Sequence, residues 1–178
     1  MSPKPKYTAK RKNLRTKIAW RHVWSLTRRN SSLGEKALRL FSNNYSCSQA
    51  VLLTVAEHWK LENDLLAKVA FAFGGGMGCG SVCGAVTGGI MAIGLKWGKS
   101  EASGKSIETG MLNFKLAGAF CRQFKKQNGS VVCKELIGFD LSDPLQFKRA
   151  FDENAYERCP SFVKSAVEIL ATLSPDKV

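Results

Sequence analysis

Apolar positions recur along most of this chain with the spacing of an α-helix. From Leu33 onward they return about every 3.6 residues between short breaks, and no run alternates as a half-buried strand requires. Helices are expected over residues 33–41, 46–59, 63–73, 81–97, 104–127, 131–137, 144–151 and 160–173. The pattern predicts an all-α protein, a compact multi-helix bundle.

Capping residues and apolar stripes support several of these helices. Ser46 with Gln49 makes a capping-box pattern, Ser130 precedes the helix over 131–137, and Asp143 precedes Pro144 at a first helical position. Apolar stripes of helical spacing face a core in globular proteins. We expect two such stripes to be buried. The first, in the helix over 104–127, consists of Ile107, Met111, Phe114, Gly118 and Cys121. The second, in the helix over 160–173, consists of Phe162, Val163, Ala166, Val167, Leu170 and Leu173.

The run from Val69 to Leu95 has no charged side chain and contains nine glycines. Glycine disfavours a helix by about 1 kcal/mol relative to alanine, so the run suits close packing. The segment 74–76 allows a tight turn with positive φ, and Gly80, Gly84 and Gly88 predict a bare helical face on which a neighbouring helix packs. The run is longer than the roughly 20 residues that span a membrane, but the glycine turn divides it. We favour a buried central helix.

The charge divides the chain into two parts. The net charge is +13, and residues 1–34 carry ten of the 27 Lys and Arg residues and no acidic residue. We therefore expect a basic, disordered arm over 1–33 and a single helical domain over 34–173. The arm contains Trp20 and Trp24 and could contact nucleic acid or an acidic surface, but a solvated tail is the favoured interpretation. Its composition also resembles a transit peptide.

Six cysteines set the candidate chemistry. No secretory signal is visible, so we expect a reducing, cytoplasmic compartment, in which cysteines serve metal or redox chemistry. There is no C-x-x-C pair, no C-x-x-C-H haem attachment and no nucleotide-binding or hydrolase motif. His22 and His58 show no ligand spacing. We expect neither haem nor nucleotide, and whether the protein is an enzyme is left open.

The cysteines differ in their positions on the predicted helices. Cys47, Cys83, Cys133 and Cys159 fall in first turns, where free N–H groups and the helix dipole favour a thiolate and lower its pKa. Cys79 is predicted in a loop, and Cys121 in the core. The first four are therefore the candidate redox or metal-binding residues.

The same four cysteines stand in recognisable segments, which are CGAVTG (83–88), SVVCKELIG (130–138) and RCPSFV (158–163) in addition to Cys47. Together these resemble the redox-active bacterial and archaeal family named for its C_GCAxxG_C_C cysteine pattern, over roughly residues 34–172. The resemblance implies that the four are the family's signature cysteines, with Cys79 and Cys121 outside the signature. The family is also similar to part of a dimeric cytochrome that is thought to carry an iron–sulfur centre.

Three functional hypotheses follow. The leading one is an electron-transfer module in which Cys47, Cys83, Cys133 and Cys159 ligate an iron–sulfur cluster and exchange electrons with a redox partner protein. The alternatives are a metal-free thiol–disulfide protein and a binding module with a structural Cys₄ zinc site. The glycine-faced helix also makes a homodimer a candidate.

The basic arm is predicted to be dispensable for folding, because its charge and prolines oppose a packed core. Removing residues 1–32 should leave the far-ultraviolet circular dichroism per helical residue and the melting temperature nearly unchanged. A large loss of unfolding cooperativity would instead show that Trp20 and Trp24 belong to the core.

Overall fold

The computed structural model describes residues 32–61, 63–99 and 106–178, so the expected arm lies almost wholly outside the described residues. Within these ranges the regular elements are helical, which confirms the all-α prediction, and β-pairing is limited to one isolated bridge. The helices are α2 (Leu33–Ser42), α3 (Cys47–Trp59), α4 (Leu66–Phe71), α5 (Gly84–Trp97), α6 (Ser106–Asn128), α7 (Cys133–Ile137), α8 (Pro144–Asp152) and α9 (Cys159–Thr172), with the short turns η1 (Gly76–Gly80), η2 (Ala155–Arg158) and η3 (Pro175–Lys177).

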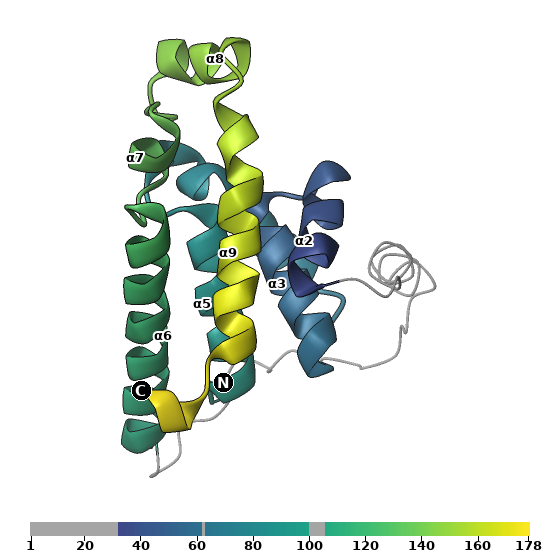
Figure 1. Cartoon of the computed structure of the whole chain (residues 1–178), viewed down its shortest axis with the longest axis vertical. Coiled ribbons are helices and arrows are strands. Elements are labelled where there is room, and N and C mark those ends of the chain that lie inside the picture. The colour runs from purple at the N-terminus through teal and green to yellow at the C-terminus, as the bar shows by residue number, and fades with distance from the viewer. Residues whose placement is uncertain (1–31, 62, 100–105) are drawn as a thin grey trace, which may run out of the picture.

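The long helices form a bundle in which α3, α5 and α9 start at the same end (Figure 1). Helices α2 and α6 run in the opposite direction, and the short α7 and α8 lie at the end where the other three begin. The most extensive contact is between α3 and α5, and α9 packs against α2, α3, α5 and α6. The positive ends of three helix dipoles therefore face one end of the bundle.

Two predicted caps are present in the structure. The Ser46 hydroxyl accepts a hydrogen bond from the Gln49 N–H (3.4 Å), and the Gln49 side-chain oxygen accepts one from the Ser46 N–H (2.9 Å). Asp143 accepts a hydrogen bond from the Leu145 N–H (2.8 Å), with Pro144 as the first residue of α8. The capping side chains therefore predicted the starts of α3 and α8 correctly.

Several other boundaries differ from the prediction. The helix expected over 63–73 is the shorter α4, and the helix expected from residue 81 begins at Gly84, because Cys83 has extended backbone angles (φ −52°, ψ 137°). Helix α7 starts at Cys133, since the Ser130 hydroxyl accepts from the Val132 N–H before the helix begins. Helix α9 begins at Cys159, one residue before Pro160. No boundary error moves a signature cysteine away from a helix start.

The bare face of the glycine-rich helix packs on the start of α3, as predicted for Gly84 and Gly88. A Cβ atom on Gly84 would overlap the Cys47 Sγ, and one on Gly88 would lie 2.5 Å from the Ser48 carbonyl oxygen. Gly80 does not belong to this face, because it lies in η1 with φ +68°. The helix is buried over most of its length, and in the described part of the chain no helix is long and apolar enough to cross a membrane.

The predicted burial of the stripe on α6 is wrong for its first three residues, whereas Cys121 is partly buried against the core. The exposed fractions of Ile107, Met111 and Phe114 are 73%, 56% and 80%. Helix α6 instead buries Leu116, Phe120 and Phe124, and the Phe120 ring fills the space beside Gly89. The helix carries two apolar faces, and periodicity does not tell which one meets the core of its own chain.

The corresponding prediction for α9 is confirmed over most of the stripe. Phe162, Val163, Ala166, Val167 and Leu170 are buried, and Leu173 is partly buried against the same core.

The close approach of α5 to α3 gives a stability prediction. Gly88→Ala should lower the free energy of unfolding by about 1–3 kcal/mol, as overpacking in a dense core does, because the new methyl group would meet the Ser48 backbone. Gly94→Ala is the matched control, since no atom lies within 4 Å of its added Cβ, and it should stabilise α5 by up to about 1 kcal/mol. Urea unfolding of both variants tests this, and equal effects would show that the helices are not in close contact.

Candidate four-cysteine site

Four thiols line a single cavity at the end of the bundle where α3, α5 and α9 begin. Cys47, Cys83, Cys133 and Cys159 all face this cavity, whose volume is about 310 Å³. Cys47, Cys133 and Cys159 are the first residues of α3, α7 and α9, and Cys83 is the N-cap of α5. The structure thus brings together the four cysteines singled out by their predicted helix starts.

Cys47 and Cys83 are brought together by the contact between α3 and α5. Gly84 directly follows Cys83, and its bare Cα lies against the Cys47 side chain. Gly74 allows a similar approach on the other side, because a Cβ there would lie 2.7 Å from the Ser46 Cβ. The glycines at this contact make room for sulfur as well as for helix backbone.

Cys83 and Cys133 are held by a short antiparallel pairing. Val82 and Val132 form the isolated bridge, the Cys83 N–H donates to the Val131 carbonyl (2.8 Å), and the Cys133 N–H donates to the Ser81 carbonyl (2.6 Å). Each cysteine follows a bridge residue, so the pairing sets both at the cavity wall. Gly76, with φ +63°, is required beside them, since a Cβ would lie 2.7 Å from the Cys133 Cβ.

Tyr156 is a residue of the site that sequence reasoning missed. It lies in η2, three residues before Cys159, and lines the same cavity. Burial raises the pKa of the Tyr156 phenol, and the nearby Cys133 and Cys159 raise it further by charge repulsion. Its phenol is thus a protonated hydrogen-bond donor next to two sulfurs. The nearness of Tyr156 to Cys159 in the sequence was the only available signal.

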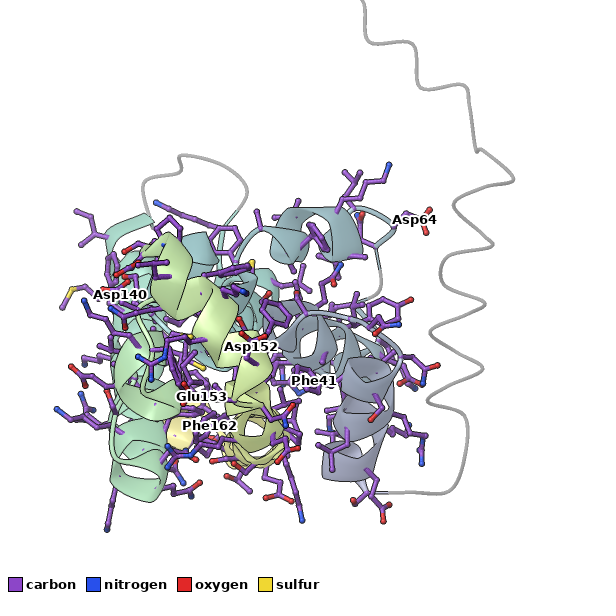
Figure 2. The ribbon with its side chains drawn as sticks, turned by 90° about the horizontal axis from the view of Figure 1, so that it is seen from above. Phe41, Asp64, Asp140, Asp152, Glu153 and Phe162 are labelled. Carbon is purple, nitrogen blue, oxygen red and sulfur yellow. The ribbon has the colours of Figure 1, made fainter. Side chains whose placement is uncertain are left out.

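Apolar groups complete the cavity. They include Phe41 of α2, Phe147 of α8 and Phe162 of α9, and Figure 2 shows this end of the bundle from above with Phe41 and Phe162 labelled. The described residues that line the cavity include no carboxylate, imidazole or basic side chain. The thiols therefore have apolar surroundings and no counter-charge from the lining side chains.

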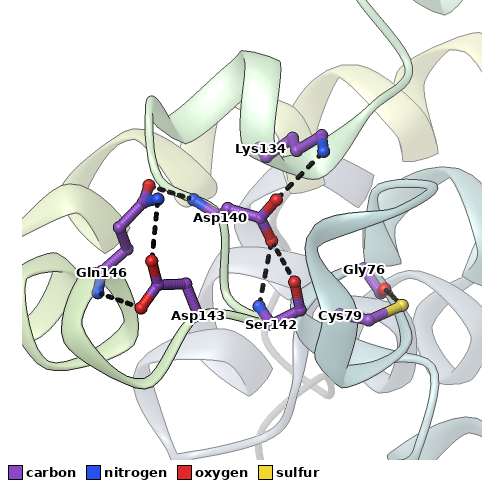
Figure 3. A network of polar contacts seen from close by, with 7 residues as sticks. All are labelled: Gly76, Cys79, Lys134, Asp140, Ser142, Asp143 and Gln146. Carbon is purple, nitrogen blue, oxygen red and sulfur yellow. Dashed lines mark hydrogen bonds and ion pairs between the residues drawn. The ribbon is translucent and has the colours of Figure 1, made fainter.

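A polar network fixes the loop between α7 and α8, which contributes Leu141 to the cavity (Figure 3). Asp140 accepts hydrogen bonds from the Ser142 hydroxyl (2.6 Å) and N–H (3.0 Å) and pairs with Lys134 (3.0 Å). The Ser142 hydrogen bond and then the Lys134 hydrogen bond lower the pKa of Asp140 to about 2. The Asp140 N–H donates to the Gln146 side chain (2.9 Å), which ties the loop to α8.

The electrostatics of the thiols differ from the sequence prediction. We expected helix starts to lower the cysteine pKa values, but burial raises the pKa of Cys83 to about 12 and that of Cys133 to about 11, and the neighbouring Cys47 adds charge repulsion to both. Burial likewise raises the pKa of Cys159. The N–H groups of Ala85 and Val86 do lower the pKa of Cys83, as the helix start predicts. Desolvation outweighs them because the cavity is apolar.

The four thiols share one cavity, and all six cysteines of the chain are free thiols. Over the described residues, no group of three or more His, Cys, Asp or Glu side chains is arranged to hold a metal ion.

The other two cysteines and the described histidine stand apart from this arrangement. Cys79 is exposed in η1, where its thiol donates to the Gly76 carbonyl (3.2 Å), and it is close enough to Cys133 to contribute to raising that pKa. Cys121 is partly buried on α6 against the core, where burial raises its pKa. His58 is exposed near the end of α3, and His22 lies outside the described residues. Of the described residues among these, Cys79, Cys121 and His58 do not line the cavity.

Fold and site together define a helical protein in which one apolar cavity collects four cysteines from four helix starts. Residues 45–173 match the family described as Putative redox-active protein (C_GCAxxG_C_C). The chain belongs to this family. No curated protein and no solved structure matches the chain.

The raised pKa values predict slow alkylation of the buried thiols. At pH 8 a thiol with a pKa of about 11 holds roughly a hundredfold less thiolate than an ordinary cysteine, so in the reduced, metal-free protein Cys83 and Cys133 should react with iodoacetamide far more slowly than the exposed Cys79. The alkylation rates of Cys83 and Cys133 should keep rising up to about pH 11, because their raised pKa values shift formation of the thiolate to higher pH. Peptide mass spectrometry measures each rate, and equal rates for Cys79 and Cys133 at pH 8 would contradict the burial argument.

Proposed function

We propose that this protein is an electron-transfer module in which Cys47, Cys83, Cys133 and Cys159 together bind an iron–sulfur cluster. The observation that carries the proposal is the meeting of these four thiols, from four helix starts, on one apolar cavity. Iron–sulfur clusters are held by sets of four cysteine thiolates. The redox-active character of the family agrees with this chemistry.

The raised pKa values of the thiols favour binding of metal cations over reactions of free thiolates. Desolvation and mutual repulsion keep Cys83 and Cys133 protonated near neutral pH, and a protonated thiol is a poor nucleophile for disulfide exchange. Metal ions offset both penalties, because they displace the thiol protons and neutralise the charge of the thiolates. The same features that disfavour a reactive thiol pair therefore favour a metal-bound set.

The redox character of the family favours a cluster over a single zinc ion. Soft thiolate ligands suit iron–sulfur clusters and zinc alike, but zinc has no redox chemistry of its own. The family is described as redox-active, so a redox-capable cluster agrees with that description better than zinc does.

The chain's own residues have three tasks in such a site. The four cysteines bind, the backbone N–H groups of the helix starts offset negative charge, and Phe41, Phe147 and Phe162 supply apolar walls. A bound cluster supplies reversible one-electron transfer. The Tyr156 phenol, whose pKa is raised, stays a hydrogen-bond donor near Cys133 and Cys159. A redox partner protein, acting in the cytoplasm, would accept or deliver the electron.

Single substitutions test which thiols bind. After anaerobic purification or reconstitution with iron and sulfide, Cys47→Ser, Cys83→Ser, Cys133→Ser and Cys159→Ser should each lose most of the charge-transfer absorption and the iron content, because three ligands leave an open position. The matched control is Cys121→Ser, which removes a partly buried thiol outside the cavity. It should keep the spectrum, with at most a loss of stability of about 1–3 kcal/mol from a buried hydroxyl.

Three outcomes would contradict the proposal. Stoichiometric zinc without iron indicates a structural zinc site, and a colourless, metal-free protein whose cysteines oxidise in pairs indicates thiol–disulfide chemistry. Loss of the spectrum in Cys79→Ser or Cys121→Ser, with retention in Cys47→Ser, would show that a different set of thiols binds.

A further inference from the structure

Helix α6 presents an apolar face that the described residues leave exposed. Ile107, Met111 and Phe114 recur at helical spacing on one side of the helix, opposite in orientation to the buried residues Leu116 and Phe120. Contiguous exposed apolar groups of this kind mark interaction sites. The exposed stripe is therefore available for contact with another molecule.

A small pocket lies beside the most exposed of these side chains. It has a volume of about 180 Å³ and is lined by Gly98, Gly110, Asn113 and Phe114 among others. A cavity of about 150 Å³ can take up a benzene ring. The same face thus offers a protruding phenyl ring and, next to it, a space large enough for one.

We propose that α6 packs antiparallel against α6 of a second copy of this chain, with Phe114 of each copy entering the pocket of the other. Contact across a two-fold axis requires a self-complementary surface, and a projecting ring beside a ring-sized pocket meets that requirement. An axis near residue 112 brings Phe114 opposite Gly110 of the second copy and places the two Met111 side chains at the centre. This interface does not depend on the cofactor bound at the four cysteines.

Charges on α6 agree with the antiparallel arrangement. Glu108 and Lys115 are seven residues apart, so they lie on the same flank of the stripe. With antiparallel helices and a two-fold axis near residue 112, Glu108 of one copy comes beside Lys115 of the other. The symmetry produces this pair twice, once on each side of the axis. Both side chains are exposed, and neither takes part in an ion pair among the described residues. A second copy therefore supplies each with a partner of opposite charge.

The area suits a reversible dimer. A phenylalanine side chain buries about 150–250 Å², so three large exposed side chains from each copy, with their neighbours, bring the buried total to roughly 1,000 Å² or somewhat more, near the lower bound for specific interfaces. We expect an association that depends on concentration.

Sedimentation equilibrium of the full chain over a concentration series tests the interface. The wild-type mass should approach twice 19.5 kDa, and Phe114→Glu should reduce it to that of one chain by placing two charges in an apolar contact. Leu145→Glu on α8 is the matched control, since Leu145 is 76% exposed but lies outside the stripe, and it should leave the dimer intact. Lys115→Glu should weaken association several-fold, and adding Glu108→Lys should restore it. Circular dichroism confirms folding of each variant.

Three results would overturn the proposal. The first is a wild-type mass of one chain at every concentration. The second is a dimer that Leu145→Glu dissociates while Phe114→Glu does not, which would place the interface elsewhere. The third is a monomer that becomes a dimer only after residues 1–31 are removed, because the basic arm would then be what covers the stripe.

Discussion

The close approach of α5 to the start of α3 is the contact on which both the fold and the site depend. It exists because Gly84 and Gly88 have no side chains where the Cys47 sulfur and the Ser48 backbone lie. The two helices run in the same direction, so their like dipole ends meet, which costs free energy unless negative charge collects there. Cys47 and Cys83 lie at this point. The contact that builds the core thus also creates an environment that favours an anion-bearing site.

The four sulfurs are subject to two opposing effects. Helix starts favour the thiolate, while apolar walls and the neighbouring sulfurs favour the thiol, and the raised pKa values of Cys83 and Cys133 show that desolvation dominates in the free protein. A bound cation would reverse the balance, since it removes the protons and provides the missing counter-charge. The site is therefore best understood as one four-thiol set.

Sequence patterns predicted the helices and the grouping of the cysteines, but not the packing between elements. The cap of Ser46 with Gln49 is local, so the start of α3 at Cys47 could be predicted directly. The starts at Cys83, Cys133 and Cys159 have no side-chain cap, so breaks in the apolar pattern located them only to within a few residues. The direction of the pKa shifts depends on which walls enclose the thiols, and those walls come from residues as distant as Phe41 and Phe147. The orientation of α6 was not predicted for a similar reason, because the helix has two apolar faces. The face with Phe120 is buried because its ring packs into the space beside Gly89.

Native mass spectrometry of the anaerobically isolated chain tests the central claim most directly, because it counts bound atoms and lost protons in one measurement. We expect a mass increase equal to one iron–sulfur cluster per chain, together with the loss of the four thiol protons of Cys47, Cys83, Cys133 and Cys159. A mass increase of a single zinc ion, or a metal-free mass lower by the hydrogens of two disulfides, would contradict it.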